Sequence, residues 1–407
     1  MPMQPSHRDA AWPRVAVVIP CYNEAGHIAA CLGDVFAQDY PPEQLRVIVA
    51  DGMSTDGTRD ILDRLGQRWN ERLKVVDNPR RRQAAALAAM IDGLVSTSGS
   101  ATTPDDLVDV IVRMDVHARY APDYVRQCVA VLDETGADNV GGAARPLAYS
   151  DFQRALASAL SSPLGVGGAG YRDANREGLV DTVFPGAFRR DVFERVGNFD
   201  PDAIANEDAE FNQRLLDAGG RIYLSRRIVV HYVPRGSMPA LARQYFSYGQ
   251  GRARTFAKHG RLPTIRPLLP AALLAGLVAV VMTNRIHRLA KPIVGGYLAG
   301  CLAEALRVGW RTPPRATSEL VGGVERRTDA AHPPEAEGIA PADEPLLDRL
   351  RRVGLVAAIF PVLHLSHGTG FWTGLWRRRA LLVAARRRPT GPRPTRASSG
   401  ATRTPTA

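Results

Sequence analysis

The stretch "VAVVIPCYNEAGHIAACL", residues 15–32, combines a short apolar run with a second set of apolar residues spaced along the chain. Five apolar residues precede Pro20, and apolar side chains then recur at Ile28 and Leu32. A short apolar run ending in proline is typical of a buried strand, whereas apolar residues four positions apart favour one face of a helix. The stretch therefore predicts a strand, a turn and a helix, the opening of a β-α-β unit.

The same alternation continues along the first half of the chain. Further apolar strand patterns occur in "LRVIVADGMSTDGT" (45–58), "LKVVD" (73–77) and "LVDVIVRMD" (107–115), with helical patterns between them. A later helix is predicted over residues 206–218, because Gly219 and Gly220 follow it directly. Strands that alternate with helices favour an α/β fold with a Rossmann-like, mostly parallel sheet. The glycine-rich residues 161–178 are typical of a loop that faces substrate.

Three apolar runs occupy the C-terminal part of the chain, at residues 268–282, 292–309 and 353–376. Runs of this kind beside a basic tail favour membrane helices, although core helices of a second soluble domain would show the same composition. We therefore divide the chain into a catalytic domain (14–260), hydrophobic membrane helices (267–310), a disordered polar loop (311–350), a hydrophobic membrane helix (353–376) and a disordered basic tail (377–407).

The formal net charge of +11 is concentrated at the C-terminus, where residues 377–407 hold nine Arg and no acidic residue. A basic tail after an apolar segment favours a membrane surface over a nucleic-acid groove, so we expect no nucleic-acid partner. The four cysteines have neither metal-ligand nor disulfide spacing, and the first residues lack the apolar core of a signal peptide. These features predict a protein of the inner (cytoplasmic) membrane whose catalytic domain is cytoplasmic.

Polar residues follow three of the predicted strands, in "IPCYNE" (19–24), "ADGMSTDGT" (50–58) and "MDVH" (114–117). In a doubly wound sheet the ligand binds at the carboxyl ends of the strands, so these segments should lie together. Alternate residues of a strand share one face, which lets Asp115 and His117 converge on one ligand. The first turn lacks the G-x-G-x-x-G of dinucleotide-binding proteins, which argues against a nicotinamide enzyme.

The motifs "VVIPCYNEAGHI", "VIVADGMSTDGTRDIL", "MDVH" and "NEDAEFNQRLLDAGGRI" together resemble an inverting, nucleotide-sugar-dependent glycosyltransferase of family 2 with the GT-A fold. The further stretches "VDTVFPGAFRRDVFERVGNFD" (180–200) and "LARQYFSYG" (241–249) resemble the bacterial exopolysaccharide branch of succinoglycan-type glucosyltransferases. The likeness covers about residues 14–260. No clear Q-x-x-R-W follows the acidic helix, which argues against processive chain extension.

The resemblance implies a role for each matching residue. It assigns the nucleotide base to Asp51, the wall of the nucleotide pocket to Pro20, Tyr22 and Glu24, the first acid of the D-x-D motif to Asp115, the place of its second acid to His117, and the catalytic base to Asp208, beside which we expect Glu207 to orient the acceptor. It also implies a UDP-sugar donor and a divalent cation, Mn²⁺ or Mg²⁺. Chemistry independently requires a cation for the departing diphosphate and a separate base for the acceptor hydroxyl.

Structural readings of the same residues stay open at this point. Asp51 and Asp56 could shape a turn and cap a helix, and Glu207 and Asp208 could be first-turn acids that a helix dipole favours. His117 could bind the metal or contact the diphosphate directly. The basic run 80–82 could also contact the diphosphate or form a solvated surface. His364 and His367, on one face of the third apolar run, are candidates for lining a cavity on the lipid side.

The expected function is transfer of a hexose, glucose by resemblance, from a UDP-sugar to a lipid-linked or growing polysaccharide acceptor. One alternative is a polyprenyl-phosphate glycosyltransferase of the same fold, whose acceptor is the lipid phosphate itself. The other is a catalytically silent membrane scaffold for polysaccharide assembly. The presence of Asp51, Asp115 and Asp208 argues against the scaffold.

Overall fold

The main sheet of this protein has eight strands in the order β3-β2-β1-β4-β9-β6-β10-β8 in a computed structural model that describes residues 12–95, 108–262, 264–282, 287–310 and 344–386. Its strands are β1 (Val15–Cys21), β2 (Leu45–Asp51), β3 (Leu73–Asp77), β4 (Val110–Arg113), β6 (Asn139–Gly142), β8 (Gly178–Leu179), β9 (Phe184–Arg189) and β10 (Ile222–Leu224). Strands β1 to β4 pair in parallel, and β9 runs antiparallel to β4 and β6. The predicted mostly parallel α/β sheet is confirmed.

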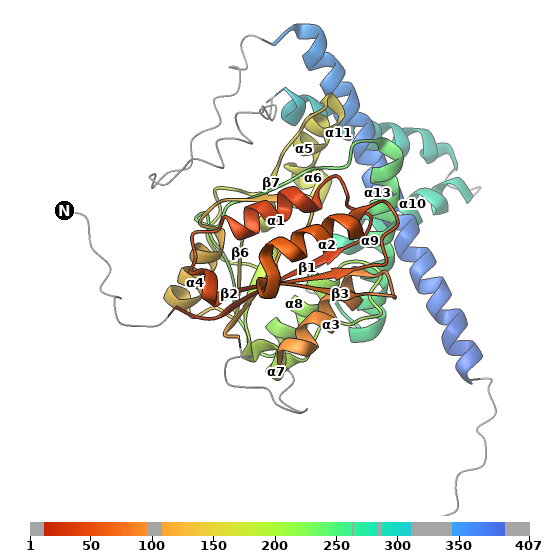
Figure 1. Cartoon of the computed structure of the whole chain (residues 1–407). Helices are drawn as coiled ribbons and strands as arrows, with labels where there is room; N and C mark the ends of the chain where they lie inside the picture. Colours follow the sequence, from red (N-terminus) through yellow and green to blue (C-terminus); the bar gives the residue numbers. More distant parts are fainter. Residues whose placement is uncertain (1–11, 96–107, 263, 283–286, 311–343, 387–407) are drawn as a thin grey trace, which may run out of the picture.

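Helices cover both faces of this sheet, as Figure 1 shows with α1 and α2 above it and α3, α7 and α8 below. The bounds are α1 (Ile28–Phe36), α2 (Thr58–Trp69), α3 (Gln83–Val95), α4 (Tyr124–Thr135), α7 (Asp191–Val196) and α8 (Glu207–Asp217). Side chains of β1 alternate between two cores: Val17 packs in the core that holds α1, α2 and α4, and Val18 in the core that holds α3, α7 and α8. Both are fully buried, as a two-sided strand requires.

A second sheet has three strands in the order β5-β11-β7, which come from segments between and after the strands of the main sheet. It consists of β5 (Ala118–Tyr120), β7 (Ala144–Pro146) and β11 (Val230–Tyr232). Strand β5 comes directly after the segment that carries Asp115 and His117, and its Tyr120 hydroxyl lies 2.6 Å from the Asp115 backbone nitrogen, which donates a hydrogen bond to it. The small sheet thus fixes the backbone at the end of β4.

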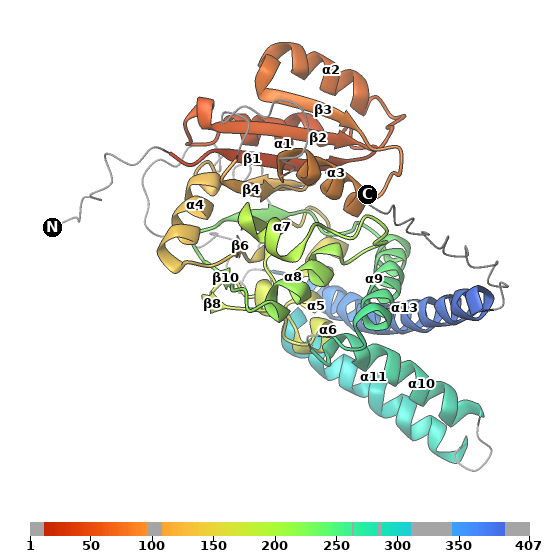
Figure 2. The same ribbon diagram turned by 90° about the horizontal axis from the view of Figure 1, so that it is seen from below.

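The remaining helices form a layer of their own, built around a third apolar core in which Leu156, Ala305 and Phe360 are buried. These helices are α5 (Asp151–Leu160), α6 (Pro163–Val166), α9 (Met238–His259), α10 (Leu269–Met282), α11 (His287–Gly309) and α13 (Leu346–Arg386). Figure 2 shows α10 and α11 side by side, extending away from the sheet, and α13 passing along α9.

Helices α9 and α13 approach each other at glycines. A Cβ atom on Gly249 would lie 2.1 Å from the carbonyl oxygen of His367, and one on Gly370 would lie 2.0 Å from that of Phe246. No side chain fits at either position, so the two backbones touch directly. This contact brings His367 of the C-terminal helix beside α9.

The three predicted apolar segments are all helical, but only part of the membrane prediction is supported. Within the described chain one helix, over Leu346–Arg379, is long and apolar enough to cross a membrane, and half of its most apolar window is buried inside the protein. The 14 residues of α10 are too few, because a span needs about 20. Helix α13 also begins before residue 353 and continues to Arg386, into the predicted tail. Residues 311–343 and 387–407 lie outside the described residues.

Candidate active site

A cavity of about 930 Å³ opens where β4, α8, α9 and α13 meet. Four of the predicted site residues line it: Asp115, His117, Glu207 and Asp208. The other four, which the resemblance gave to the nucleotide, lie at the carboxyl ends of β1 and β2: Pro20 and Asp51 within the last two residues of these strands, and Tyr22 and Glu24 in the turn after β1. The two groups adjoin at His117, whose Nδ1 lies 3.7 Å from Glu24 Oε1.

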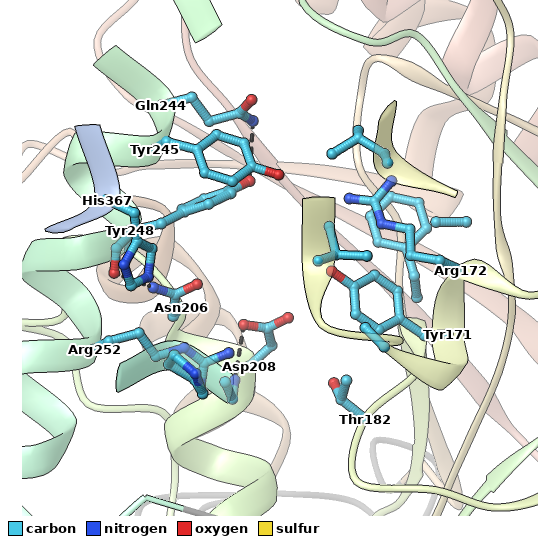
Figure 3. A pocket seen from close by; sticks show the side chains of 18 of the residues that line it. Tyr171, Arg172, Thr182, Asn206, Asp208, Gln244, Tyr245, Tyr248, Arg252 and His367 are labelled. Atoms are coloured by element: carbon cyan, nitrogen blue, oxygen red, sulfur yellow. Dashed lines mark hydrogen bonds between the residues drawn. The ribbon is translucent and has the colours of Figure 1, made fainter. Parts of the chain in front are cut away.

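Asp208 stands in the first turn of α8 and points into the cavity (Figure 3). The preceding Asn206 has a left-handed backbone with φ of 58°, which turns the chain sharply into the helix. Phe211 and Leu215 are fully buried and fix the helix against the sheet. A carboxylate on such a support is held at the helix N-terminus, where the dipole favours negative charge.

Arg113 is a central residue that sequence reasoning missed. Its Nε lies 3.1 Å from Asp115 Oδ1 and its Nη1 lies 3.1 Å from Glu207 Oε1. The three side chains are 10%, 9% and 8% exposed, so one buried cation joins the end of β4 to the start of α8. The sequence signal was the one basic residue in the strand pattern 107–115, because a charge buried in a strand requires a partner.

Burial and charge act against each other in this triad. Burial raises the pKa of Glu207, and the Arg113 guanidinium opposes that rise. Burial alone would lower the pKa of Arg113, but the carboxylates of Asp115, Glu207 and Asp208 raise it. The triad is therefore a buried charge cluster whose members depend on one another.

Asp115 and His117 would supply two protein ligands to a metal ion, and oxygens of the substrate would supply others. Asp115 Oδ1 accepts hydrogen bonds from Arg113 and, at 3.4 Å, from Gln83, whereas Oδ2 accepts none from the described residues. No group of three or more His, Cys, Asp or Glu side chains arranged for a metal occurs in the part of the chain that the structure describes. Two protein ligands with the remainder from phosphate and water suit Mn²⁺ or Mg²⁺ bound with a nucleotide. The Glu24 carboxylate, with help from Asp115, raises the pKa of His117.

Asp51 is fully buried and organises the turn after β2. Its Oδ1 accepts a 2.6 Å hydrogen bond from Ser54 Oγ, and its Oδ2 accepts from Ser54 N at 3.1 Å and from Arg59 Nη1 at 2.9 Å. Arg59 also pairs with Asp77, 2.6 Å away, and so links the ends of β2 and β3. The turn-shaping role left open by the sequence is thus present, and contact of Asp51 with a base stays a prediction.

Tyr22 forms an exposed platform beside these turns. It is 43% exposed, and a Cβ on Gly52 would lie 2.9 Å from its ring. The Arg81 guanidinium lies 5.9 Å from the ring centroid. Asn23, Met53 and Arg81 all have positive φ, of 53°, 60° and 52°. Residues with a strained backbone are common at ligand sites, and these three lie in the loops that follow β1, β2 and β3 at one edge of the sheet.

The basic run 80–82 has protein partners of its own. Arg80 forms an ion pair with Asp202, and Arg82 Nη1 lies 3.9 Å from the same carboxylate. Both arginines remain about half exposed, at 49% and 47%. The run therefore joins the turn after β3 to the loop before α8, and a diphosphate contact stays a prediction.

Residues that are far apart in the sequence line opposite walls of the cavity. Figure 3 shows Tyr248, Arg252 and His367 on one side and Tyr171 and Arg172 on the other, with Asp208 between them. The sequence had pointed to a part of each wall: residues 241–249, "LARQYFSYG", belong to the family resemblance, and the glycine-rich residues 161–178 were predicted to face substrate. His364 and His367, both on helix α13, line this cavity, and its position on the lipid side stays a prediction.

Comparison with known sequences identifies the family of this chain. Residues 16–197 match the profile of Glycosyl transferase family 2. The succinoglycan biosynthesis protein ExoA of Rhizobium meliloti is 36% identical over 299 residues, which cover 73% of this chain and 87% of that protein. A dolichyl N-acetyl-α-D-glucosaminyl phosphate 3-β-D-2,3-diacetamido-2,3-dideoxy-β-D-glucuronosyltransferase of Methanococcus voltae is 28% identical over 277 residues, covering 66% and 82%.

A similar fold occurs in a mannosyltransferase from Pyrobaculum calidifontis, solved in complex with GDP-Man and Mn²⁺. The two chains share 21% identity and a TM-score of 0.51, and the match covers 90% of this chain and 88% of that one. The GT-A fold and the family resemblance predicted from the motifs are both confirmed. This chain belongs to glycosyltransferase family 2 and is a glycosyltransferase.

Proposed function

We propose that this enzyme is an inverting glycosyltransferase that moves a hexose, glucose in the first instance, from a UDP-sugar to a lipid-linked saccharide during synthesis of an exopolysaccharide. The observation that carries the proposal is the placement of Asp208, at the rigid start of α8, in one cavity with Asp115 and His117. The 36% identity with a succinoglycan biosynthesis protein supports the pathway class.

Asp208 is the base in this proposal. An inverting displacement forms the new bond on the face of the sugar opposite the leaving group, so a carboxylate must take the proton of the acceptor hydroxyl there. The proton moves to Asp208 as the glycosidic oxygen bonds to C1, and the electrons of the broken bond leave with the diphosphate. Glu207 Oε1 lies 3.1 Å from Arg113 Nη1. Because this ion pair occupies the carboxylate, Glu207 orients the site and does not accept the proton.

The donor binds along the carboxyl ends of β1, β2 and β4. Tyr22 offers a face to the base, while Asp51 orders the turn beneath it. Asp115 Oδ2 and His117 would hold a divalent cation, and the chemistry supplied by bound Mn²⁺ or Mg²⁺ is Lewis-acid neutralisation of the departing diphosphate. The Mn²⁺ in the Pyrobaculum mannosyltransferase complex is consistent with that choice of ion.

A lipid-linked acceptor and a membrane location form the second part of the proposal. The name of the Methanococcus voltae relative describes transfer to a dolichyl-phosphate-linked sugar. Large apolar side chains are exposed along α10, α11 and α13: Val278, Val281, Met282, Leu298, Leu302, Trp372 and Trp376. Exposed apolar surface on this scale, beside a polyarginine tail, favours attachment to the inner membrane.

Attachment is tested without truncating the chain. Replacing Val281 and Met282 with lysine should release at least part of the protein from sedimented membranes, because both side chains are exposed, at 59% and 77%, and contribute no core packing. The matched control replaces two exposed polar residues of α2 in the same way. A wild-type protein that is freely soluble without detergent would contradict the membrane proposal.

The activity is tested by incubating membranes that contain the protein with a panel of labelled nucleotide sugars. The expected product is a labelled, organic-extractable saccharide formed from UDP-glucose and absent with Asp208→Asn. Product that carries the sugar directly on lipid phosphate would instead support a polyprenyl-phosphate glycosyltransferase. Absence of transfer from every donor, with intact folding, would support a silent scaffold.

A further inference from the structure

The charge of the cavity exceeds what its carboxylates can neutralise. Its walls include six arginines and four acidic residues: Arg113, Arg172, Arg235, Arg243, Arg252, Arg266, Asp115, Asp181, Glu207 and Asp208. Arg113 pairs with Asp115 and Glu207, and Arg266 pairs with Asp181. The other four arginines form no ion pair with the described residues. The surplus of positive charge therefore remains available to an anionic ligand.

Arg252 is the most informative of these cations. It lies on α9, lines the cavity and is only partly exposed. Among the residues with described positions, none accepts a hydrogen bond from its guanidinium, and no carboxylate oxygen lies within ion-pairing distance. Burial lowers the pKa of Arg252, and Asp208 opposes that effect from further away. A half-buried guanidinium with no acceptor is costly unless a ligand supplies one.

His367, from the C-terminal helix, places a second polar group without a described partner beside Arg252. It is 8% exposed, and its Nδ1 is buried without a hydrogen-bond partner in the described structure. Figure 3 shows its ring on the same wall as Arg252, next to Asn206. Neighbouring His364 differs, because Tyr297 and the Leu164 carbonyl, each 2.8 Å away, occupy both of its ring nitrogens. Only one of the two histidines thus has a nitrogen left for a ligand.

Arg172 faces them from the opposite wall (Figure 3). Its guanidinium lies 5.1 Å from the ring centroids of both Tyr171 and Tyr232, and it donates a hydrogen bond to the Tyr232 hydroxyl. Its Nε is buried and has no partner among the described residues. Two aromatic rings hold this cation in place, although no carboxylate neutralises it.

The same cavity continues into an apolar part. Leucines of α5, the α6 segment, α10 and α13 line it: Leu160, Leu164, Leu269, Leu273 and Leu363. These elements belong to the layer whose outer surface exposes the large apolar side chains named above. A site that joins unpaired cations to a leucine-lined end suits an amphipathic anion rather than a soluble one.

We propose that Arg252, His367 and Arg172 form an acceptor-binding subsite for the phosphate or diphosphate group of an isoprenyl lipid, whose hydrocarbon chain lies against the leucine-lined end. The proposal rests on the glycosyltransferase function above and names the class of its acceptor. Asp208 lies between the two walls, so the subsite would set the acceptor sugar beside the base. Arg252 and His367 both lie beyond residues 16–197, the part that matches the family profile, whereas the predicted donor residues Pro20 to Asp115 lie within it.

The test measures binding by the full-length protein in detergent micelles. Farnesyl diphosphate is the probe, inorganic pyrophosphate and farnesol are its two halves, and UDP reports the donor site. We expect Arg252→Gln and His367→Leu each to weaken farnesyl diphosphate binding by at least tenfold and to leave UDP binding within twofold. His367→Asn, which keeps a donor near the Nδ1 position, should retain most of the affinity.

Arg254→Gln is the matched control. It removes the same charge from the same helix, but Arg254 pairs with Asp200 at 2.9 Å and does not line the cavity. This variant should bind farnesyl diphosphate like the wild type. If Arg252→Gln fails to fold, as thermal melting would reveal, Arg252→Lys and the two His367 variants carry the test.

Several results would overturn the inference. Unchanged affinity in Arg252→Gln and His367→Leu would remove these residues from the acceptor site. Loss of UDP binding in the same variants would assign them to the donor. Equal affinity for inorganic pyrophosphate and farnesyl diphosphate would refute the lipid part, and equal affinity for farnesol would refute the anionic part. Failure of the wild type to bind UDP would instead count against the proposed function.

Discussion

Replacing Arg113 with methionine tests whether the buried triad supports both the fold and the site. The substitution keeps an unbranched side chain but leaves the carboxylates of Asp115 and Glu207, 9% and 8% exposed, without their shared cation. Removing one partner of a buried ion pair typically costs about 3–5 kcal/mol. We therefore expect a loss of about that size in the free energy of unfolding, measured by urea denaturation of the detergent-solubilised protein at pH 8.

The pH dependence of this loss has a definite sign. Burial already raises the pKa of Glu207, and removal of Arg113 removes the charge that opposes the rise. A carboxyl group whose folded pKa exceeds its unfolded value stabilises the fold at low pH, and that contribution is lost as pH rises through the folded pKa. The deficit of Arg113→Met relative to wild type should therefore be smaller at pH 5 than at pH 8.

The same variant should lose activity beyond its loss of stability. Arg113 fixes Asp115 relative to the helix of Asp208, and misplacement by about 1 Å can lower turnover by about 10²-fold. Asp200→Asn is the control, since it breaks the Asp200–Arg254 ion pair, 2.9 Å long, outside the cavity. That control should lose stability with little change in kcat/KM for the folded enzyme. Normal stability and normal kcat/KM in Arg113→Met would refute the reasoning.

Three further predictions address other parts of the molecule. Asp208→Asn should lower kcat by about 10²- to 10⁴-fold with little change in UDP-sugar affinity. If Asp208→Asn keeps near-normal turnover while Glu207→Gln abolishes activity, Glu207 is the base. His117→Asp should shift the metal preference from Mn²⁺ towards Mg²⁺, which favours oxygen ligands; equal metal titrations in both proteins would argue against ligation. The pKa of Asp200 is lowered to about 2, because hydrogen bonds and charge from Arg254 and its neighbours outweigh burial. Asp200→Asn should therefore cost about 2 kcal/mol at pH 7, and urea titrations should show the difference shrinking as pH falls from about 4 to 2; a constant difference would contradict it.

Local patterns in the sequence were enough to predict the catalytic part of the fold. The strand at residues 73–77 and the helix that carries Asp208 follow from apolar spacing and from the glycines that end the helix, all within a few residues of each other. The three-residue strands of the small sheet are too short to show a period, so they were harder to recognise.

The missed parts of the site depend on contacts between distant segments. The link from Arg113 to Glu207 requires β4 and α8 to be neighbours, which no local pattern encodes. His367 was expected in a separate membrane segment, yet the glycine contact between α9 and α13 brings it to the cavity of the catalytic domain. Sequence reasoning assigned roles to one wall because its residues follow strands. On the other wall it named His367 but not Arg172 or Arg252, because packing alone brings these arginines to the cavity.

The glycine contact between α9 and α13 also determines how the protein can be shortened for laboratory work. Composition alone would favour a fragment that ends before the apolar helices, since such a fragment leaves out the least soluble segments. That fragment would uncover the surface of α9 at Gly249, where the α13 backbone now lies, and it would lack one side of the cavity. Recombinant production should therefore keep α13 and replace its outward-facing Trp376, 73% exposed, with a polar residue.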